Sequence, residues 1–379
     1  MAFSGAERAR REKAIRGVME AKGLEALILI GDTNVGSEYL GDFRYYVDNR
    51  IIAGQQAAVL LPQGEPVLFV GTAIQQQAAS RRSSVRDCRV SDNLLADTVG
   101  LLKKQNILKG KIGISFAMVS VPWFNYLKKE LPDIEWIETH EDIFDIRTHH
   151  TPEEADLFRK CGMIGAGEFE AAAKMIKPGV TEYEIAAAIE EHGRVLGAEQ
   201  HFTLVGSGRY VPGEGNGLPL PYSPSQRPVE VGDSVVMEIT PRVEGYWTQI
   251  VRTVNVARPN AELEKLYRVS CDAIRKGLEV FKPGKTIRDV VLAMDAYVKE
   301  CGYLFRPPTG HICGVDLIEG RVSPQNTRVL EPGTAVIIHP TVGTPDGKNT
   351  FFWGETYLVT DTGHERLNPV TDELLTVGV

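Results

Sequence analysis

The sequence lacks several features that mark particular classes of protein. No apolar run approaches the roughly 20 residues of a membrane-spanning helix. The N-terminal stretch MAFSGAERARREKAIRGVMEAKG has no apolar core, so it predicts a charged amphipathic helix and not a signal peptide. Basic residues are scattered through a chain whose net charge is −8. We therefore expect neither a membrane nor a nucleic acid as partner.

Cysteine is scarce and has no recognisable spacing. The chain has five cysteines, an odd number, and none of them forms a Cys-x-x-Cys pair. This composition argues against a zinc ribbon and against a disulfide scaffold. The sequence is instead typical of a protein of the reducing cytoplasm.

The chain is long enough for two hydrophobic cores. At 379 residues, two domains are the default expectation. The first part alternates strands such as LEALILIG with helical segments such as NLLADTVGLLKKQNI, which predicts a small α/β domain with a mixed sheet. Thr151-Pro152 followed by two glutamates is a strong helix start. We place the domains at 1–147 and 148–379.

The second part contains an internal repeat. The segments IKPGVTEYEIAAAIEEHGRVLG (176–197) and FKPGKTIRDVVLAMDAYVKECG (281–302) share Lys-Pro-Gly, a later threonine, a helical pattern and a terminal glycine, all at one offset of 105 residues. A chance similarity between two helix caps is a weaker explanation than a repeat, because several residues match at a single offset. Two such halves usually pack around a pseudo-twofold axis, with a site between them.

Isolated polar residues stand in apolar, strand-like runs of both halves. The runs VVMEI, TQIV, GHICGV, AVIIHP and FFWGETYLV carry Glu238, Gln249, His311, His339 and Glu355. Burying such groups without partners costs a few kcal/mol or more. A single buried His or Glu is usually structural, but five in matching contexts predict a shared pocket.

These motifs resemble the pita-bread family of creatinase, prolidase, aminopeptidase P and methionine aminopeptidase. The similarity runs through RPVEVGDSVVMEI, EGYWTQIVRTV, TGHICGVDLIEG, LEPGTAVIIHP and ETYLVTDTGHERL. It implies an α/β (α+β) protein with a small N-terminal mixed-sheet domain and a C-terminal pita-bread domain with a pseudo-twofold repeat. It also implies a homodimer, in which YLGDFRYYVDNRIIAG (39–54) brings Arg44 and Arg50 near the neighbour's active site.

The sequence departs from the family at its metal site. Family peptidases hold two metal ions with Asp, Asp, His, Glu and Glu. By position, these ligands fall on Glu238, Gln249, His311, His339 and Glu355, so only His311 and the last Glu survive. A dinuclear centre needs carboxylates to bridge and neutralise the ions. We therefore expect no two-metal site.

Our main expectation is a creatinase-like hydrolase of a non-peptide C–N bond in a small polar nitrogenous compound, without a metal cofactor. Glu238 and Glu355 would bind or protonate a nitrogen, His311 or His339 would activate water, and Gln249 would hydrogen-bond the substrate. Further candidates for substrate binding are Tyr222, which stands where family peptidases have His, and His201 and Arg306. The loop GSGRYVPGEGNGLPLPYSPSQ (206–226) is long enough to be functional.

Two alternatives stay open. Glu238, His311, His339 and Glu355 could hold a single Zn, Mn or Fe ion in a mononuclear hydrolase or lyase. The second alternative is an Xaa-Pro peptidase, or a catalytically retired relative that serves as a binding subunit.

Overall fold

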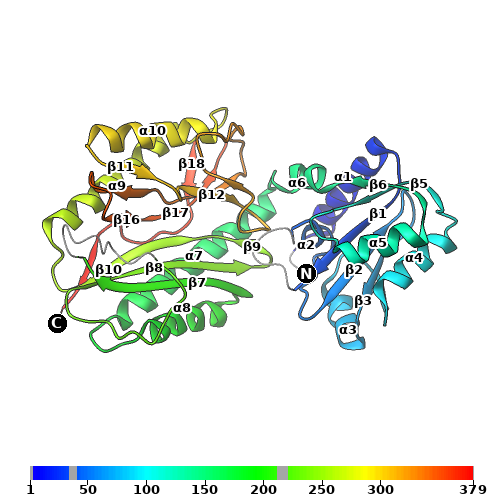
Figure 1. Cartoon of the computed structure of the whole chain (residues 1–379), viewed down its shortest axis with the longest axis horizontal. Helices are drawn as coiled ribbons and strands as arrows, with labels where there is room; N and C mark the ends of the chain where they lie inside the picture. Colours follow the sequence, from blue (N-terminus) through cyan, green and yellow to red (C-terminus); the bar gives the residue numbers. More distant parts are fainter. Residues whose placement is uncertain (1–2, 34–40, 211–220, 379) are drawn as a thin grey trace. The chain divides into compact units, whose positions relative to one another are not determined.

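The computed structural model describes all residues except 1–2, 34–40, 211–220 and 379. The chain forms two compact units, Met1–His149 and His150–Val379 (Figure 1). The division lies two residues beyond the boundary expected after residue 147. Within the described residues, no helix has the length and apolar character needed to cross a membrane.

The first unit is a mixed sheet between two layers of helices. Its six strands have the order β4-β3-β2-β1-β5-β6, with β1–β2 and β2–β3 antiparallel and the other pairs parallel. Alternate residues of β1 enter two separate cores, Leu27 and Leu29 on one face and Ile28 and Ile30 on the other. Burial of both faces explains the unbroken apolar run of this strand. The elements are β1 (Leu24–Asp32), β2 (Gln55–Leu60), β3 (Val67–Val70), β4 (Asp87–Val90), β5 (Lys109–Ile114), β6 (Asp133–Glu138), α1 (Gly5–Lys22), α2 (Gly41–Val47), α3 (Ala73–Arg82), α4 (Leu94–Lys104), α5 (Val121–Glu130) and α6 (His140–Arg147).

The second unit contains the repeat as two helix pairs, α7 (Pro152–Met175) with α8 (Glu182–Leu196) and α9 (Ala261–Val280) with α10 (Ile287–Glu300). Capping boxes start α8 at Thr181 and α10 at Thr286, each with an acidic residue three positions on. The two Lys-Pro-Gly turns also form equivalent backbone bonds, Gly179 N–H to the Val229 oxygen and Gly284 N–H to the Leu330 oxygen. The predicted repeat is confirmed.

The helix pairs pack on a ten-stranded sheet whose main path is β13-β12-β14-β17-β10-β8-β7 (Figure 1). The pair α7 and α8 shares a core with β8 and β10, whereas the core of α9 and α10 includes β12, β14 and β17 and also Val236 of β8 and Val251 of β10. The two halves of the sheet meet where β10 pairs with β17. Its strands are β7 (Gln200–Arg209), β8 (Asp233–Val243), β9 (Tyr246–Trp247), β10 (Ile250–Val256), β12 (Gly310–Cys313), β13 (Gly320–Arg321), β14 (Ala335–Ile338), β17 (Gly354–Val359), β18 (His364–Arg366) and β19 (Leu375–Val377); a separate three-stranded sheet contains β11 (Leu304–Arg306), β15 (Thr341–Gly343) and β16 (Thr350–Phe352).

Candidate functional site

The strand registers determine which side chains share a face of the ten-stranded sheet. Val251 lies opposite Glu238 on one side and Gly354 on the other. Its neighbour Ile250 lies opposite Glu355. Because successive residues of a strand point to opposite faces, Glu238, Val251 and Gly354 lie on one face, here called the site face. Ile250 and Glu355 lie on the other, here called the helix-covered face.

Two histidines join Glu238 on the site face. His311 pairs with Ile337, and the adjacent Ile338 pairs with Glu355, so His311 points away from the helix-covered face. His339 follows Ile338 and therefore shares the face of His311. The centroids of the two imidazole rings are 5.6 Å apart. The structure thus brings Glu238, His311 and His339 to one face of the sheet.

The groups on the site face are held close to electrical neutrality. Burial raises the pKa of Glu238 to about 7, so the carboxyl is partly protonated at neutral pH. Burial lowers the pKa of His311 to about 4, and burial with the nearby His311 lowers that of His339 to about 3. Both imidazoles are therefore neutral at pH 7. Within the described residues, neither Nδ1 atom has a hydrogen-bond partner.

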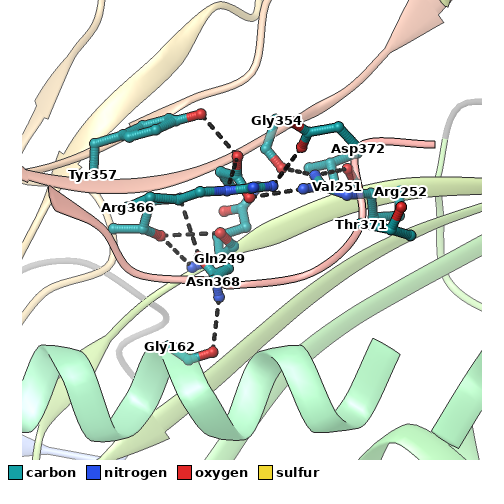
Figure 2. A network of polar contacts seen from close by, with 12 residues as sticks. Gly162, Gln249, Val251, Arg252, Gly354, Tyr357, Arg366, Asn368, Thr371 and Asp372 are labelled. Atoms are coloured by element: carbon teal, nitrogen blue, oxygen red, sulfur yellow. Dashed lines mark hydrogen bonds and ion pairs between the residues drawn. The ribbon is translucent and has the colours of Figure 1, made fainter. Parts of the chain in front are cut away.

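Gln249 precedes Ile250, so strand alternation directs its side chain to the site face. Its backbone is fixed by Thr356, whose hydroxyl accepts from the Gln249 N–H at 2.8 Å and donates to the Gln249 oxygen at 2.9 Å. Asn368 in turn accepts from the Thr356 N–H and donates to the Gly162 oxygen at 3.1 Å (Figure 2). The Gln249 side chain is fully buried, and neither amide atom has a partner in the described part of the chain.

Glu355 is not brought together with the other candidates, because it lies on the helix-covered face. Its Oε2 accepts from Arg252 at 2.7 Å, and its Oε1 accepts from Arg366 and from the Tyr357 hydroxyl, both at 2.8 Å (Figure 2). The Arg252 side chain is fully buried, so Glu355 is the counter-ion of a buried cation. The structure corrects the proposed catalytic or metal-binding role of Glu355 to a structural one.

Gly354, and not Glu355, occupies the position on the site face opposite Val251. A Cβ added there would collide with the Ile338 carbonyl oxygen and lie 2.5 Å from the Cβ of His339. A shift of one residue along a strand moves a side chain to the opposite face. Glu355 therefore lies one residue away from the position on the site face at which the family motif would place a metal ligand.

The structure also places the other candidates for substrate binding apart from Glu238, His311 and His339. His201 lies opposite Pro241, three residues from the Leu204–Glu238 pair, and therefore points to the helix-covered face. There its Nε2 lies 2.7 Å from Oε1 of the buried Glu168 on α7. Tyr222 is 77% exposed and Arg306 bonds the Gly347 oxygen. Residues 211–220 of the predicted functional loop lie outside the described residues.

Arg44 and Arg50 belong to the first unit. Arg44 is buried in α2, whereas Arg50 is exposed just beyond that helix. Residues 39–40 of the segment predicted to approach a neighbouring subunit lie outside the described part.

Arg321 is a candidate that motif comparison missed. It lies directly opposite His311 on β13, so both side chains share the site face. Arg321 is exposed, and its charge contributes to the lowered pKa of His311. The strand has only two residues. No periodic pattern could therefore have revealed it.

The model of metallopeptidase family M24 matches residues 156–361, which is more than half of the chain. The chain belongs to this family. The creatinase/prolidase N-terminal domain matches residues 11–149. An Xaa-Pro dipeptidase of Pyrococcus furiosus is 25% identical over 370 residues, with 96% of each chain covered.

Two further relatives show the range of the family. A creatinase of a Bacillus species is 26% identical over 91% of this chain and 86% of its own. A prolidase of Pyrococcus horikoshii superposes with a TM-score of 0.82 at 23% identity, covering 97% of this chain and all of that one. The predicted pita-bread fold and family are confirmed.

The family membership corrects two expectations from the sequence. A hydrolase of non-peptide C–N bonds is contradicted, because the relatives and structural neighbours include an Xaa-Pro dipeptidase and prolidases that span nearly the whole chain. The relatives favour the Xaa-Pro peptidase alternative. The expectation of no metal cofactor is contradicted as well, because the family is one of metallopeptidases. The chain is a member of a hydrolase family.

The residues present do not fit the metal centre that the family implies. Glu355 is bound by two arginines, and Gln249 supplies no charge to neutralise an ion. Among the described residues, no group of three or more His, Cys, Asp or Glu side chains is placed to hold a metal ion. The proposed mechanism therefore contains no step through a metal.

Proposed function

We propose that this chain hydrolyses short peptides at Xaa-Pro bonds, with Glu238 as general base and acid. The observation that carries the proposal is a partly buried carboxyl with a pKa of about 7 on the same face as two neutral imidazoles. A general base works best when its pKa lies near the working pH. The names of the relatives, Xaa-Pro dipeptidase and prolidase, support the choice of bond.

In this mechanism, ionised Glu238 takes a proton from water as the water oxygen attacks the carbonyl carbon of the scissile bond. N–H groups of His311, His339 and Gln249 donate to the oxygen that becomes negative, as in an oxyanion hole. The C–N bond then breaks, and Glu238 returns the proton to the departing proline nitrogen. Arg321 binds the C-terminal carboxylate, because it is the exposed cation beside His311.

The test is release of free proline from Ala-Pro and Gly-Pro, with Ala-Ala as the comparison substrate. Assays run with and without added Mn²⁺. Because Glu238 must be ionised to act as base, kcat/KM should rise with pH and level off above about pH 7. The Glu238→Gln variant should lose about 10²–10⁴-fold in kcat/KM.

The control is Glu373→Gln, which removes an exposed carboxylate outside the site and should leave the kinetics unchanged. No proline release under either condition would overturn the proposed hydrolase. Binding of Ala-Pro without turnover would then indicate a peptide-binding relative, a role favoured by the absence of a side chain at Gly354 on the site face.

We also infer a homodimer, which the creatinase/prolidase N-terminal domain supports. Light scattering should give about twice the chain mass of 41.8 kDa, and a monomer would contradict the inference.

We also propose that the protein is located in the reducing cytoplasm, because its five cysteines are free. Cell fractionation that places the protein in an oxidising compartment would contradict this location.

A further inference from the structure

The side-chain amide of Gln249 is buried without a hydrogen-bond partner among the described residues, which is energetically unfavourable. Its side chain is fully buried, and both Nε2 and Oε1 are without partners in the described structure. A buried polar group without a partner destabilises the folded protein, because it has given up its hydrogen bonds to water. A ligand that both donates to Oε1 and accepts from Nε2 would remove that cost. A peptide group, which offers one N–H and one C=O, has this combination.

The cross-strand neighbour of Gln249 on the site face is neutral. The register that pairs Ile250 with Ile239 places Thr240 across from Gln249, and the buried Thr240 hydroxyl is also without a partner among the described residues. His311 and His339 lie on the same face, and neither Nδ1 atom has a partner among the described residues. Gln249 and Thr240 are both uncharged, so they suit an uncharged ligand better than an ionic one.

An Xaa-Pro bond cannot satisfy Gln249 alone. The proline nitrogen of that bond carries no hydrogen, so the bond can accept from Nε2 but cannot donate to Oε1. The missing N–H must come from the next group on the N-terminal side. In a free dipeptide this group is an ammonium, whose burial among neutral groups costs several kcal/mol. Pairing that ammonium with ionised Glu238 would prevent Glu238 from accepting a proton from water.

We propose that the site selects peptides whose residue before proline is acylated, as in an N-acetylated dipeptide or an internal residue of a longer peptide. The inference rests on the proposed Xaa-Pro hydrolysis and names its substrate class. The amide on the N-terminal side donates to Gln249 Oε1, and Gln249 Nε2 donates to the scissile carbonyl. Glu238 remains available as base.

The experiment compares Ala-Pro with N-acetyl-Ala-Pro on the full-length protein. Rates of proline release give the ratio of kcat/KM values, and isothermal titration calorimetry at 5 °C gives the ratio of Kd values independently of turnover. N-acetyl-Ala-Pro should be favoured about tenfold or more in both, because its amide N–H makes the hydrogen bond to Oε1 that Ala-Pro lacks and no ammonium is buried.

Two variants of Gln249 sharpen the test. Gln249→Leu has a similar side-chain size but lacks both polar atoms, and it should reduce the preference because the hydrogen bond to Oε1 is lost. Gln249→Glu supplies a counter-ion for an ammonium and should shift the preference toward Ala-Pro. Circular dichroism checks that each variant is folded. If one variant is unfolded, the ratios measured on the wild-type protein and on the other variant test the inference.

The outcomes separate this inference from the proposed function. Equal or tighter binding of Ala-Pro, an unchanged ratio in Gln249→Leu, or binding of neither peptide would overturn the inference. If no proline is released but calorimetry still favours N-acetyl-Ala-Pro, the inference about ligand class stands and the proposed hydrolase fails. If Ala-Pro is cleaved faster, the hydrolase stands and the inference fails.

Discussion

At the scale of single residues, two glutamates with similar sequence contexts have opposite physical roles. Glu238 lies on the site face and has no ion-pair partner among the described residues, so burial alone raises its pKa. Glu355 lies on the helix-covered face and neutralises Arg252 and Arg366. A carboxylate with two cationic partners stabilises the fold, whereas one without a partner is available for chemistry.

We predict that Glu355→Gln destabilises the protein by about 3–5 kcal/mol, because it leaves the buried Arg252 cation without its counter-ion. Urea unfolding at pH 7 measures the change in the free energy of unfolding. The pH dependence of any remaining activity should keep the same midpoint near pH 7, since that midpoint belongs to Glu238 on the opposite face of the sheet. A stable Glu355→Gln protein with a shifted pH profile would contradict this assignment.

The same two residues show what the sequence could and could not predict. It identified Glu238, His311 and His339 as polar groups in buried strands, and the structure places all three on one face. Strand alternation follows from local sequence, but the partner register of β17 does not, because it depends on long-range pairing with β10 and β14. The motif comparison was therefore one residue out at Glu355.

At the scale of elements, the helices marked by residues close together in the sequence were predicted most reliably. The threonine caps and Lys-Pro-Gly turns predicted α8 and α10 because capping involves residues three positions apart. His201 was a less local case, since its partner Glu168 lies on α7, 33 residues earlier in the chain. No pattern within β7 could reveal that pair.

The close approach of β14 and β17 leads to a prediction for Gly354. Gly354→Ala should destabilise the protein by about 1–3 kcal/mol, because the new Cβ collides with the Ile338 oxygen and crowds His339. Gly363→Ala, in the same unit, is the matched control, because an added Cβ there meets no atom within 4 Å. Thermal unfolding compares the two variants. Equal midpoints for both would show that the strands move apart without cost.

At the scale of the whole molecule, composition and length predicted the two-unit architecture, but the function required the relatives. The substitutions at Gln249 and His339 suggested a non-peptide substrate, whereas the family comparison points to peptide bonds. Fold and chemistry are separable in this way because a site occupies few residues of a scaffold. The fold that this chain shares with its relatives therefore constrains the substrate class less than the side chains beside Glu238 on the site face do.

The two units have separate hydrophobic cores, which leads to the prediction that they unfold in separate transitions. Leu27→Ala in the first unit and Leu266→Ala in the second each remove a fully buried side chain, at a cost of about 2–5 kcal/mol. In differential scanning calorimetry, each variant should lower the midpoint of one transition and leave the other in place. A single transition that both variants lower equally would mean that the units unfold as one cooperative body.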